Sequence, residues 1–256
     1  MPIGISTLCT FGETFKKIGF YRESTPPVIE VIDDWADRLD GARISLLLDL
    51  GSVLNIRYTI HAPIIDLNIA SANERVKRLS TQLVKESIDH ARELGALLVV
   101  VHPGSFPPDN RGDPEAHWSL NSESLSEICE YAARERVEVC LENMPAGTRL
   151  FFQTPRDFLR ASEEGLDFEV ALDVGHANTR GSLGEFLTLL KGRIRHLHLH
   201  DNMGDRDAHL PVGKGGIDWD LLKREIDLSS LTAVVEANTI PDALESVAAA
   251  RQVFSS

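Results

Sequence analysis

The sequence predicts an α/β fold, a single (β/α)8 TIM barrel that spans residues 1–256, and three observations support it. Short apolar runs recur along the whole chain. Amphipathic or loop segments separate these runs, which is the alternation of a parallel sheet with helices packed on its outside. No glycine-rich phosphate-binding turn follows the first run, which weakens the alternative of an open, doubly wound sheet.

The expected strands are the eight apolar runs, taken in chain order, each of which is followed by a helical or loop segment. The runs are Ile3–Thr7, Val28–Asp33, Arg57–Ala62, Leu97–His102, Val137–Glu142, Phe168–Asp173, Arg193–His200 and Leu231–Glu236.

The expected helices lie between these strands and carry apolar residues at helical spacing. Thr154 followed by Pro155 is a helix-start signal, a capping residue before a proline at the first helical position. The first unit is the weakest, because Phe11–Pro27 contains proline and glycine and has no clear apolar face. The expected helices are Asn73–Leu94, Ser122–Arg136, Thr154–Glu164, Leu183–Lys191, Trp219–Ile226 and Asp242–Phe254.

Composition excludes several classes of protein. No apolar run approaches the roughly 20 residues of a membrane-spanning helix, and the N-terminal segment lacks the pattern of a signal peptide. We therefore expect a cytoplasmic protein with no membrane partner. Cys9, Cys129 and Cys140 are scattered, which argues against a disulfide framework and against a thiolate zinc site. The net charge of −13 does not favour nucleic acid, although carboxylates that bind cations contribute to this charge without repelling phosphate.

Metal-competent side chains stand at the ends of the last six expected strands or in the loops behind them. Carboxylates and neutral imidazoles are the preferred ligands of zinc and similar ions. The C-terminal ends of barrel strands converge on one mouth, and an unpaired charge buried there would cost several kcal/mol. We therefore expect a divalent metal site at this mouth. The nine residues are His61, His102, Glu142, Asp173, His176, His198, Asp207, His209 and Glu236.

The motifs that carry these residues resemble a known family. IHAP, VVHPG, LEN, DVGHA, HLHLHD, DAHLPVGKGGID and VVEAN, in this order, are similar to the xylose isomerase-like TIM-barrel superfamily. This superfamily includes endonuclease IV and the sugar and sugar-phosphate isomerases and epimerases. The resemblance extends from about residue 28 to residue 240.

The two branches of the superfamily imply different metal sites, so the resemblance implies one to three divalent ions (Zn, Mn or Mg) per chain as cofactor. In the isomerase and epimerase branch a single ion is held by two glutamates, an aspartate and a histidine, which match Glu142, Asp173, His198 and Glu236 here. In the endonuclease IV branch three zinc ions use the same four residues and five more. Those five match the remaining members of the set: His61, His102, His176, Asp207 and His209.

We expect a sugar or sugar-phosphate isomerase or epimerase, in which the metal stabilises an enediolate and Glu142 and Glu236 act as acid and base. His176 and Arg206 are expected to orient the substrate, and Lys214 to meet a substrate phosphate. The resemblance does not determine the oligomeric state, and a homo-oligomer is one of the alternatives.

The alternative is an endonuclease IV-like trinuclear zinc phosphodiesterase acting on abasic-site DNA, which the complete ligand set favours. Against it, Ala-Pro-Ile-Ile follows His61, where the endonucleases carry a bulky polar or aromatic group. The mouth loops also offer scattered cations rather than a basic track, namely Arg111, Arg149, Arg180, Arg206 and Lys214. A metal-free binding protein is disfavoured, because no ligand is missing.

For several other polar and aromatic residues we expect supporting or surface positions. Glu30 and Asp33 end the second strand, and two alternatives remain for them: contact with the substrate, or exposure to solvent. His196 is expected below His198 as a supporting or core residue. His200 is expected to replace or assist His198. His90 and His117 are expected at the surface, and Phe106 and Trp118 in loop packing or in the pocket wall.

Overall fold

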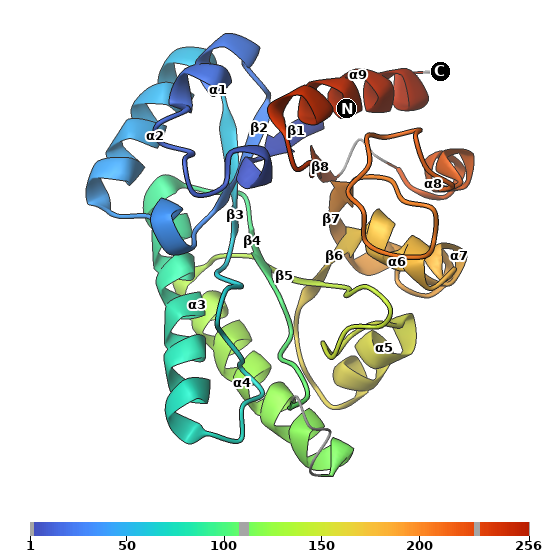
Figure 1. Cartoon of the computed structure of the whole chain (residues 1–256). Helices are drawn as coiled ribbons and strands as arrows, with labels where there is room; N and C mark the ends of the chain where they lie inside the picture. The colour runs from blue at the N-terminus through green and yellow to red at the C-terminus, as the bar shows by residue number, and fades with distance from the viewer. Residues whose placement is uncertain (1–2, 108–112, 228–230, 256) are drawn as a thin grey trace.

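Eight parallel strands close into one barrel in this computed structural model, which describes residues 3–107, 113–227 and 231–255. Each strand pairs with the next one along the chain, and β8 pairs with β1, so that the described strands leave no free sheet edge. The helices lie outside this barrel (Figure 1). The predicted (β/α)8 fold is therefore confirmed.

The strands agree with the predicted runs, with ends that differ by one or two residues. The fourth strand is the shortest, because His102 has already left the sheet and begins the loop at the barrel mouth. The strands are β1 Ile3–Ser6, β2 Val28–Ile32, β3 Arg57–His61, β4 Val99–Val101, β5 Val139–Glu142, β6 Glu169–Asp173, β7 Ile194–Leu199 and β8 Thr232–Val235.

The helices include elements that the sequence pattern does not reveal. Helix α4 begins at Pro114, well before the expected Ser122, because Asp113 caps the Glu115 backbone N–H and Pro114 suits the first turn. Helices α1, α2 and α6 were not expected. The helices are α1 Ile18–Ser24, α2 Gly41–Leu54, α3 Glu74–Leu94, α4 Pro114–Glu135, α5 Pro155–Glu163, α6 Val174–Thr179, α7 Leu183–Leu189, α8 Trp219–Glu225 and α9 Ile240–Ser255.

The main apolar core lies between the strands and the surrounding helices. Leu197 and Leu199 of β7, for example, belong to the same buried cluster as Phe186 of α7. His196 and His198 alternate with these leucines, and each has an exposed fraction of 0%. Strand β7 therefore presents leucines to the core outside the barrel and imidazoles to its inside. No helix among the described residues is long and apolar enough to cross a membrane.

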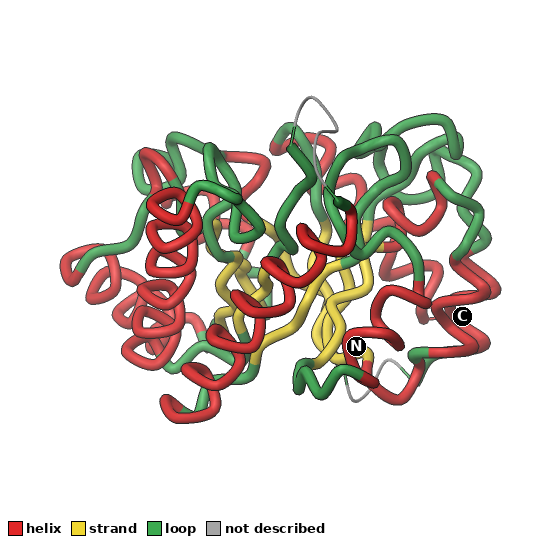
Figure 2. Tube along the Cα trace, turned by 90° about the horizontal axis from the view of Figure 1, so that it is seen from below, coloured by secondary structure: helices red, strands yellow, loops and turns green. Residues whose placement is uncertain are grey.

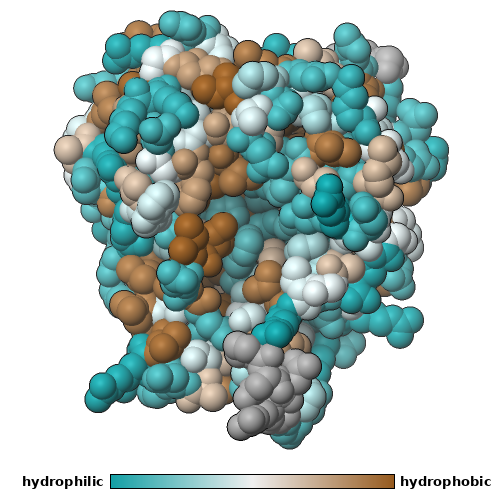
Figure 3. Space-filling view, viewed as in Figure 1, coloured by the Kyte–Doolittle hydropathy of each residue, from teal (hydrophilic) through white to brown (hydrophobic). Residues whose placement is uncertain are grey.

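The loops that follow the strands gather on one face of the molecule (Figure 2). The face in Figure 3 has a central hollow, and the atoms visible inside it belong to hydrophilic residues. Polar groups thus collect where the carboxyl ends of the strands meet, which is the place where such barrels carry their chemistry.

Candidate metal centre

The nine side chains expected as ligands lie close together at the carboxyl ends of β3 to β8 and in the loops that follow. Together with His200 they form three neighbouring groups: the first two share Glu142, and the third lies against Asp173 through His176 and His200. We call Glu142, Asp173, His198 and Glu236 the central site. His61, His102 and Glu142 form the His61 site, and His176, His200, Asp207 and His209 form the loop site.

The central site is built around one nitrogen of His198. Its Nδ1 lies 3.4 Å from Glu142 Oε1, 3.7 Å from Asp173 Oδ2 and 3.5 Å from Glu236 Oε1. These distances exceed those of ordinary hydrogen bonds. They match the separation of about 3.4 Å between ligands that each lie about 2.1 Å from a tetrahedral ion. All four residues are buried, so water does not compensate their charges.

Both nitrogens of His198 face carboxylates. Nε2 lies 3.1 Å from Glu30 Oε1, on the side of the ring away from the central site. A neutral imidazole carries one N–H, so one of its nitrogens must present a lone pair to carboxylate oxygen. That arrangement is repulsive unless a cation or a second proton lies between them. Burial acts to lower the pKa of His198, but the charges of Glu236, Glu30 and Glu142 outweigh burial and raise it well above its usual value.

The His61 site shows the same conflict with a tautomer that is fixed. His61 Nδ1 lies 2.8 Å from the carbonyl oxygen of Ala62, which can only accept a hydrogen bond, so Nδ1 carries the proton. Nε2 therefore faces Glu142 Oε2 at 3.3 Å without a proton of its own in the neutral ring. His102 Nε2 lies 2.9 Å from the same oxygen. Burial opposes the effect of Glu142, which nevertheless raises the pKa of His61 to about 9.

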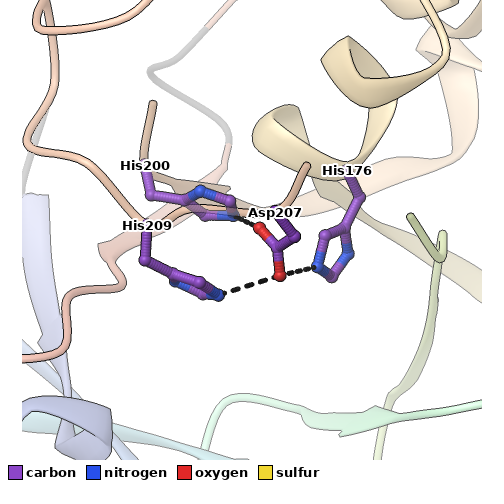
Figure 4. Close-up of side chains that lie close together, drawn as sticks. All are labelled: His176, His200, Asp207 and His209. Atoms are coloured by element: carbon purple, nitrogen blue, oxygen red, sulfur yellow. Dashed lines mark hydrogen bonds and ion pairs between the residues drawn. The ribbon is translucent and has the colours of Figure 1, made fainter. Parts of the chain in front are cut away.

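The loop site surrounds Asp207, toward which three imidazoles point (Figure 4). Asp207 Oδ2 lies 3.2 Å from His176 Nε2 and 3.1 Å from His209 Nε2. His176 Nδ1 donates to the carbonyl oxygen of Asn143 at 2.8 Å, so Nε2 again lacks a proton in the neutral ring. His200 Nε2 lies 3.6 Å from Asp207 Oδ1, and it also contacts both oxygens of Asp173, at 3.0 and 3.1 Å.

Local structure places each of these side chains. Asp173 ends β6 and caps α6 by accepting the His176 backbone N–H at 2.6 Å, which brings His176 over the mouth. The long loop after β7 is held by Asp201, whose carboxylate accepts the backbone N–H of Gly213 and the indole N–H of Trp219. His209 has a positive φ of 46°, an uncommon conformation for a residue other than glycine. The loop thus returns Asp207 and His209 to the ends of the strands.

Two polar residues have a different place from the one expected. Glu30 has an exposed fraction of 0%, and its carboxylate contacts His196 and His198 inside the barrel. Asp33 is also buried and accepts hydrogen bonds from His90, Ser87 and the Leu39 backbone. Both were assigned to substrate contact or to solvent, and both assignments are wrong, because β2 directs Glu30 into the barrel and α3 covers Asp33.

His200 and the remaining histidines also differ from expectation. His200 belongs to the loop site rather than replacing His198, and its contact with Asp173 joins the loop site to the central site. The alternation along β7 predicts an inward ring for His200, but no sequence signal separates its site from that of His198. His90 and His117 are largely covered, because His90 pairs with Asp33 and α4 extends past His117.

The described cations that were expected near the substrate are exposed at the surface. Arg206 is exposed on the loop after β7. Lys214 forms an ion pair of 2.9 Å with Glu245 of α9. Arg149 and Arg180 are exposed, and Arg111 lies outside the described residues. Phe106 and Trp118 pack against Phe151 beside a pocket of about 360 Å³.

Comparison with known proteins assigns the family. A family model described as "Xylose isomerase-like TIM barrel" matches residues 27–253. The uncharacterized protein MJ1311 of Methanocaldococcus jannaschii is 32% identical over 255 residues, which cover 96% of this chain and 87% of that protein. The probable endonuclease 4 of Mycobacterium leprae is 30% identical over 189 residues, which cover 69% of this chain and 71% of that protein.

Solved structures have the same fold. A crystal structure described as a D-tagatose 3-epimerase-like protein matches with a TM-score of 0.91 and 31% identity over 100% of this chain and 97% of that one. The D-psicose 3-epimerase of Clostridium cellulolyticum H10 matches with a TM-score of 0.80 and 17% identity over 99% of both chains. The chain therefore belongs to the xylose isomerase-like TIM-barrel family, as its motifs indicate.

Proposed function

We propose that this protein is a divalent-metal-dependent isomerase or epimerase that acts on a sugar or sugar phosphate. One observation carries the metal part of this proposal. Histidine nitrogens that lack a proton in the neutral ring face carboxylate oxygens at His61 and His176, and His198 places both nitrogens against carboxylates. A shared divalent cation turns each of these repulsive contacts into coordination.

The donor sets fit such ions. The central site offers three carboxylates and one imidazole, a set that suits Zn²⁺, Mn²⁺ or Mg²⁺, whereas the imidazole-rich His61 site and loop site suit Zn²⁺. We propose that Glu142, Asp173, His198 and Glu236 hold the ion at which the reaction takes place. When bound there, a divalent ion would polarise the carbonyl and hydroxyl oxygens of the substrate.

Glu142 and Glu236 are proposed as the proton-transfer pair. They extend from β5 and β8 and approach His198 with one oxygen each. One glutamate removes the proton from the carbon beside the substrate carbonyl, and the electron pair moves to the carbonyl oxygen to give an enediolate. The second glutamate returns a proton to carbon. Burial acts to raise the pKa of Glu142, but His102 and His198 hold it well below its usual value, so Glu142 is an ionised carboxylate.

His176 and Arg206 are proposed to orient the substrate, His176 from the edge of the central site and Arg206 from the exposed loop. Lys214 is proposed to meet a substrate phosphate in exchange for its exposed ion pair with Glu245, because surface ion pairs contribute little stability. The similarity to the D-tagatose 3-epimerase-like protein supports a ketose as the substrate class.

Deuterium exchange tests this function. We expect the metal-loaded protein, incubated with a panel of ketoses and their phosphates in deuterated water, to incorporate deuterium at the carbon beside the carbonyl of its substrate. Glu142→Gln and Glu236→Gln should abolish this incorporation. A metal-loaded protein that exchanges no proton on any member of the panel would contradict the proposal.

A phosphodiesterase on abasic-site DNA is the second candidate, favoured by the three adjacent groups of ligands and by the 30% identity to a probable endonuclease 4. Ile64 and Ile65 follow His61 at the mouth and provide no polar group for a DNA backbone. Metal-dependent cleavage of abasic-site DNA, together with about three zinc ions per chain, would support this candidate over the isomerase.

A further inference from the structure

Beneath the central site, a carboxylate is buried where neither the sequence nor the proposed chemistry requires one. Glu30 of β2 has an exposed fraction of 0%. Its oxygen Oε1 lies 3.1 Å from His198 Nε2, and Oε2 lies 3.0 Å from His196 Nε2. The hydroxyl of Thr59 donates to Oε2 at 3.1 Å. An ionised carboxylate at such depth is costly unless positive charge or hydrogen-bond donors compensate it.

The compensation available to Glu30 comes through imidazoles. His198 and His196 are the contacts that hold the pKa of Glu30 well below its usual value against the opposing effect of burial. His196 is engaged on its other side, where Nδ1 lies 2.6 Å from the Thr232 hydroxyl. His198 is the contact that also reaches the central site, because its Nδ1 faces Glu142, Asp173 and Glu236.

We propose that Glu30 is a positioning residue for the central metal site: it accepts the Nε2 proton of His198 and so directs the unprotonated Nδ1 at the ion. The proposal rests on metal binding at that site, which belongs to the proposed function. Carboxylates that hold a metal-ligating histidine fix its tautomer and increase its basicity. Glu30 would also add a negative charge close to the central site without coordinating the ion itself.

The contact between Glu30 and His198 is close without being an aligned hydrogen bond. Among the described residues, Glu30 Oε1 and His198 Nε2 have no hydrogen-bond partner by geometry, although they lie 3.1 Å apart. Coordination of an ion at Nδ1 would place the ring proton on Nε2, opposite Glu30 Oε1, where it could be donated to that oxygen.

A cation bound between Glu30, His196 and His198 is the competing arrangement, since these three residues can also bring ligand atoms together. Two features favour the positioning role. The two imidazole nitrogens contact different oxygens of Glu30, as two separate donors would. His198 can also serve the central site only through Nδ1, which leaves Nε2 to carry the proton.

The test compares zinc binding by the full-length wild type, Glu30→Gln and Glu30→Leu, using competition with a chromophoric chelator and counting ions per chain by mass spectrometry. We expect zinc affinity to fall about 10-fold in Glu30→Gln, which keeps the shape and loses the charge, and about 100-fold in Glu30→Leu. Thermal unfolding of the metal-free proteins shows whether each variant folds. If either fails to fold, Thr59→Val replaces it, with an expected loss of a few-fold.

Asp33→Asn is the matched control, because Asp33 is a buried carboxylate beside β2 that contacts a histidine outside the mouth. It should bind zinc like the wild type even if it is less stable. A folded Glu30→Leu variant with unchanged zinc affinity overturns the inference, as does the loss of a whole ion that the wild type binds at Glu30. If the wild type itself binds no divalent ion, the proposed function fails first, which separates the two outcomes.

Discussion

Asp201 and Asp173 are two fully buried aspartates at the mouth of the barrel, and their surroundings differ in kind. Asp201 accepts from the backbone N–H groups of Asn202 and Gly213 and from the indole of Trp219, all of which are obligatory donors. Asp173 accepts one backbone N–H, that of His176, at Oδ1. Its oxygens otherwise face imidazole nitrogens: His200 Nε2 lies 3.0 and 3.1 Å from the two oxygens, and His198 Nδ1 lies 3.7 Å from Oδ2. Asp201 is satisfied by groups that can only donate, whereas an imidazole nitrogen satisfies Asp173 only if it carries a proton.

The comparison extends to three other buried carboxylates, Asp33, Asp37 and Glu142, and to the half-buried Asp207. Asp33 and Asp37, like Asp201, are surrounded by donors, and each of them joins two segments of chain. Glu142 and Asp207 are surrounded by imidazole nitrogens. Burial therefore does not identify a functional carboxylate in this barrel. The identity of the atoms that face the carboxylate does, because a donor satisfies it and a lone pair leaves it in need of a cation.

The largest expected effect is that of Glu142→Gln, because Glu142 belongs to both the central site and the His61 site. An amide lowers the charge of both sites and removes a proposed proton acceptor. Substrate turnover should fall by at least about 100-fold, and at least one bound ion should be lost. Steady-state kinetics and metal analysis measure the two effects.

Glu169→Gln is the control for this variant, because Glu169 stands at the beginning of β6 and pairs with Arg195. It should retain both metal and activity. Full activity in Glu142→Gln would mean that the carboxylates facing imidazoles are not the functional ones.

Metal removal should lower the unfolding free energy through carboxylates that face imidazoles, such as Asp173, and not through those that accept from obligatory donors, such as Asp201. A chelator should lower the unfolding free energy of the wild type by about 2.7 kcal/mol relative to protein held at 100 times its Kd for zinc. Thermal unfolding with and without zinc gives this difference. In Asp173→Asn the zinc-dependent part should shrink, whereas a stabilisation by zinc that survives this change would place the ion elsewhere.

Asp201→Asn should behave in the opposite way. The amide nitrogen would replace one oxygen and face donors, either Asn202 N–H and Ile217 N–H or Gly213 N–H and the Trp219 indole. We expect a loss of about 1–3 kcal/mol in unfolding free energy with the metal content unchanged. Denaturant unfolding and metal analysis on the same preparation check this. Loss of metal without loss of stability would contradict the assignment of Asp201 to a structural role.

The smallest effect concerns His90, which pairs with Asp33 at 2.7 Å away from the mouth. Burial opposes this pairing, but Asp33 raises the pKa of His90 above its usual value. The stabilisation is therefore fully present below the unfolded pKa of about 6.5 and is lost as pH rises through the higher folded pKa. Metal-free wild type should lose about 1 kcal/mol or less over this window relative to His90→Gln, measured by denaturant unfolding. If the unfolding free energies of the two proteins change with pH in the same way, His90 does not cause the pH dependence.

The sequence predicts the barrel well, because apolar runs and helical periodicity report burial directly. It predicts less where local side chains decide the structure. Helix α2 has apolar residues on several sides, as Leu47, Leu48 and Leu50 illustrate, so its face is not visible in the pattern. The early start of α4 depends on the Asp113 cap.

The candidate site could likewise be predicted only in part. The nine expected ligands come from positions at strand ends, and the structure brings them together. The role of Glu30 could not be predicted, because it depends on which side chains meet across the inside of the barrel, from β2 to β7. The pairing of Lys214 with Glu245 depends likewise on the approach of α9 to a distant loop.

Anomalous scattering from crystals of the zinc-loaded protein tests the central claim most directly. The account predicts an ion within about 2.0–2.2 Å of His198 Nδ1 and of oxygens from Glu142, Asp173 and Glu236. It predicts no ion at Asp201 or Asp33, which are already satisfied by donors. Zinc-loaded crystals with no anomalous peak at His198, and with hydrogen-bonded water or protons joining these four side chains, would contradict it.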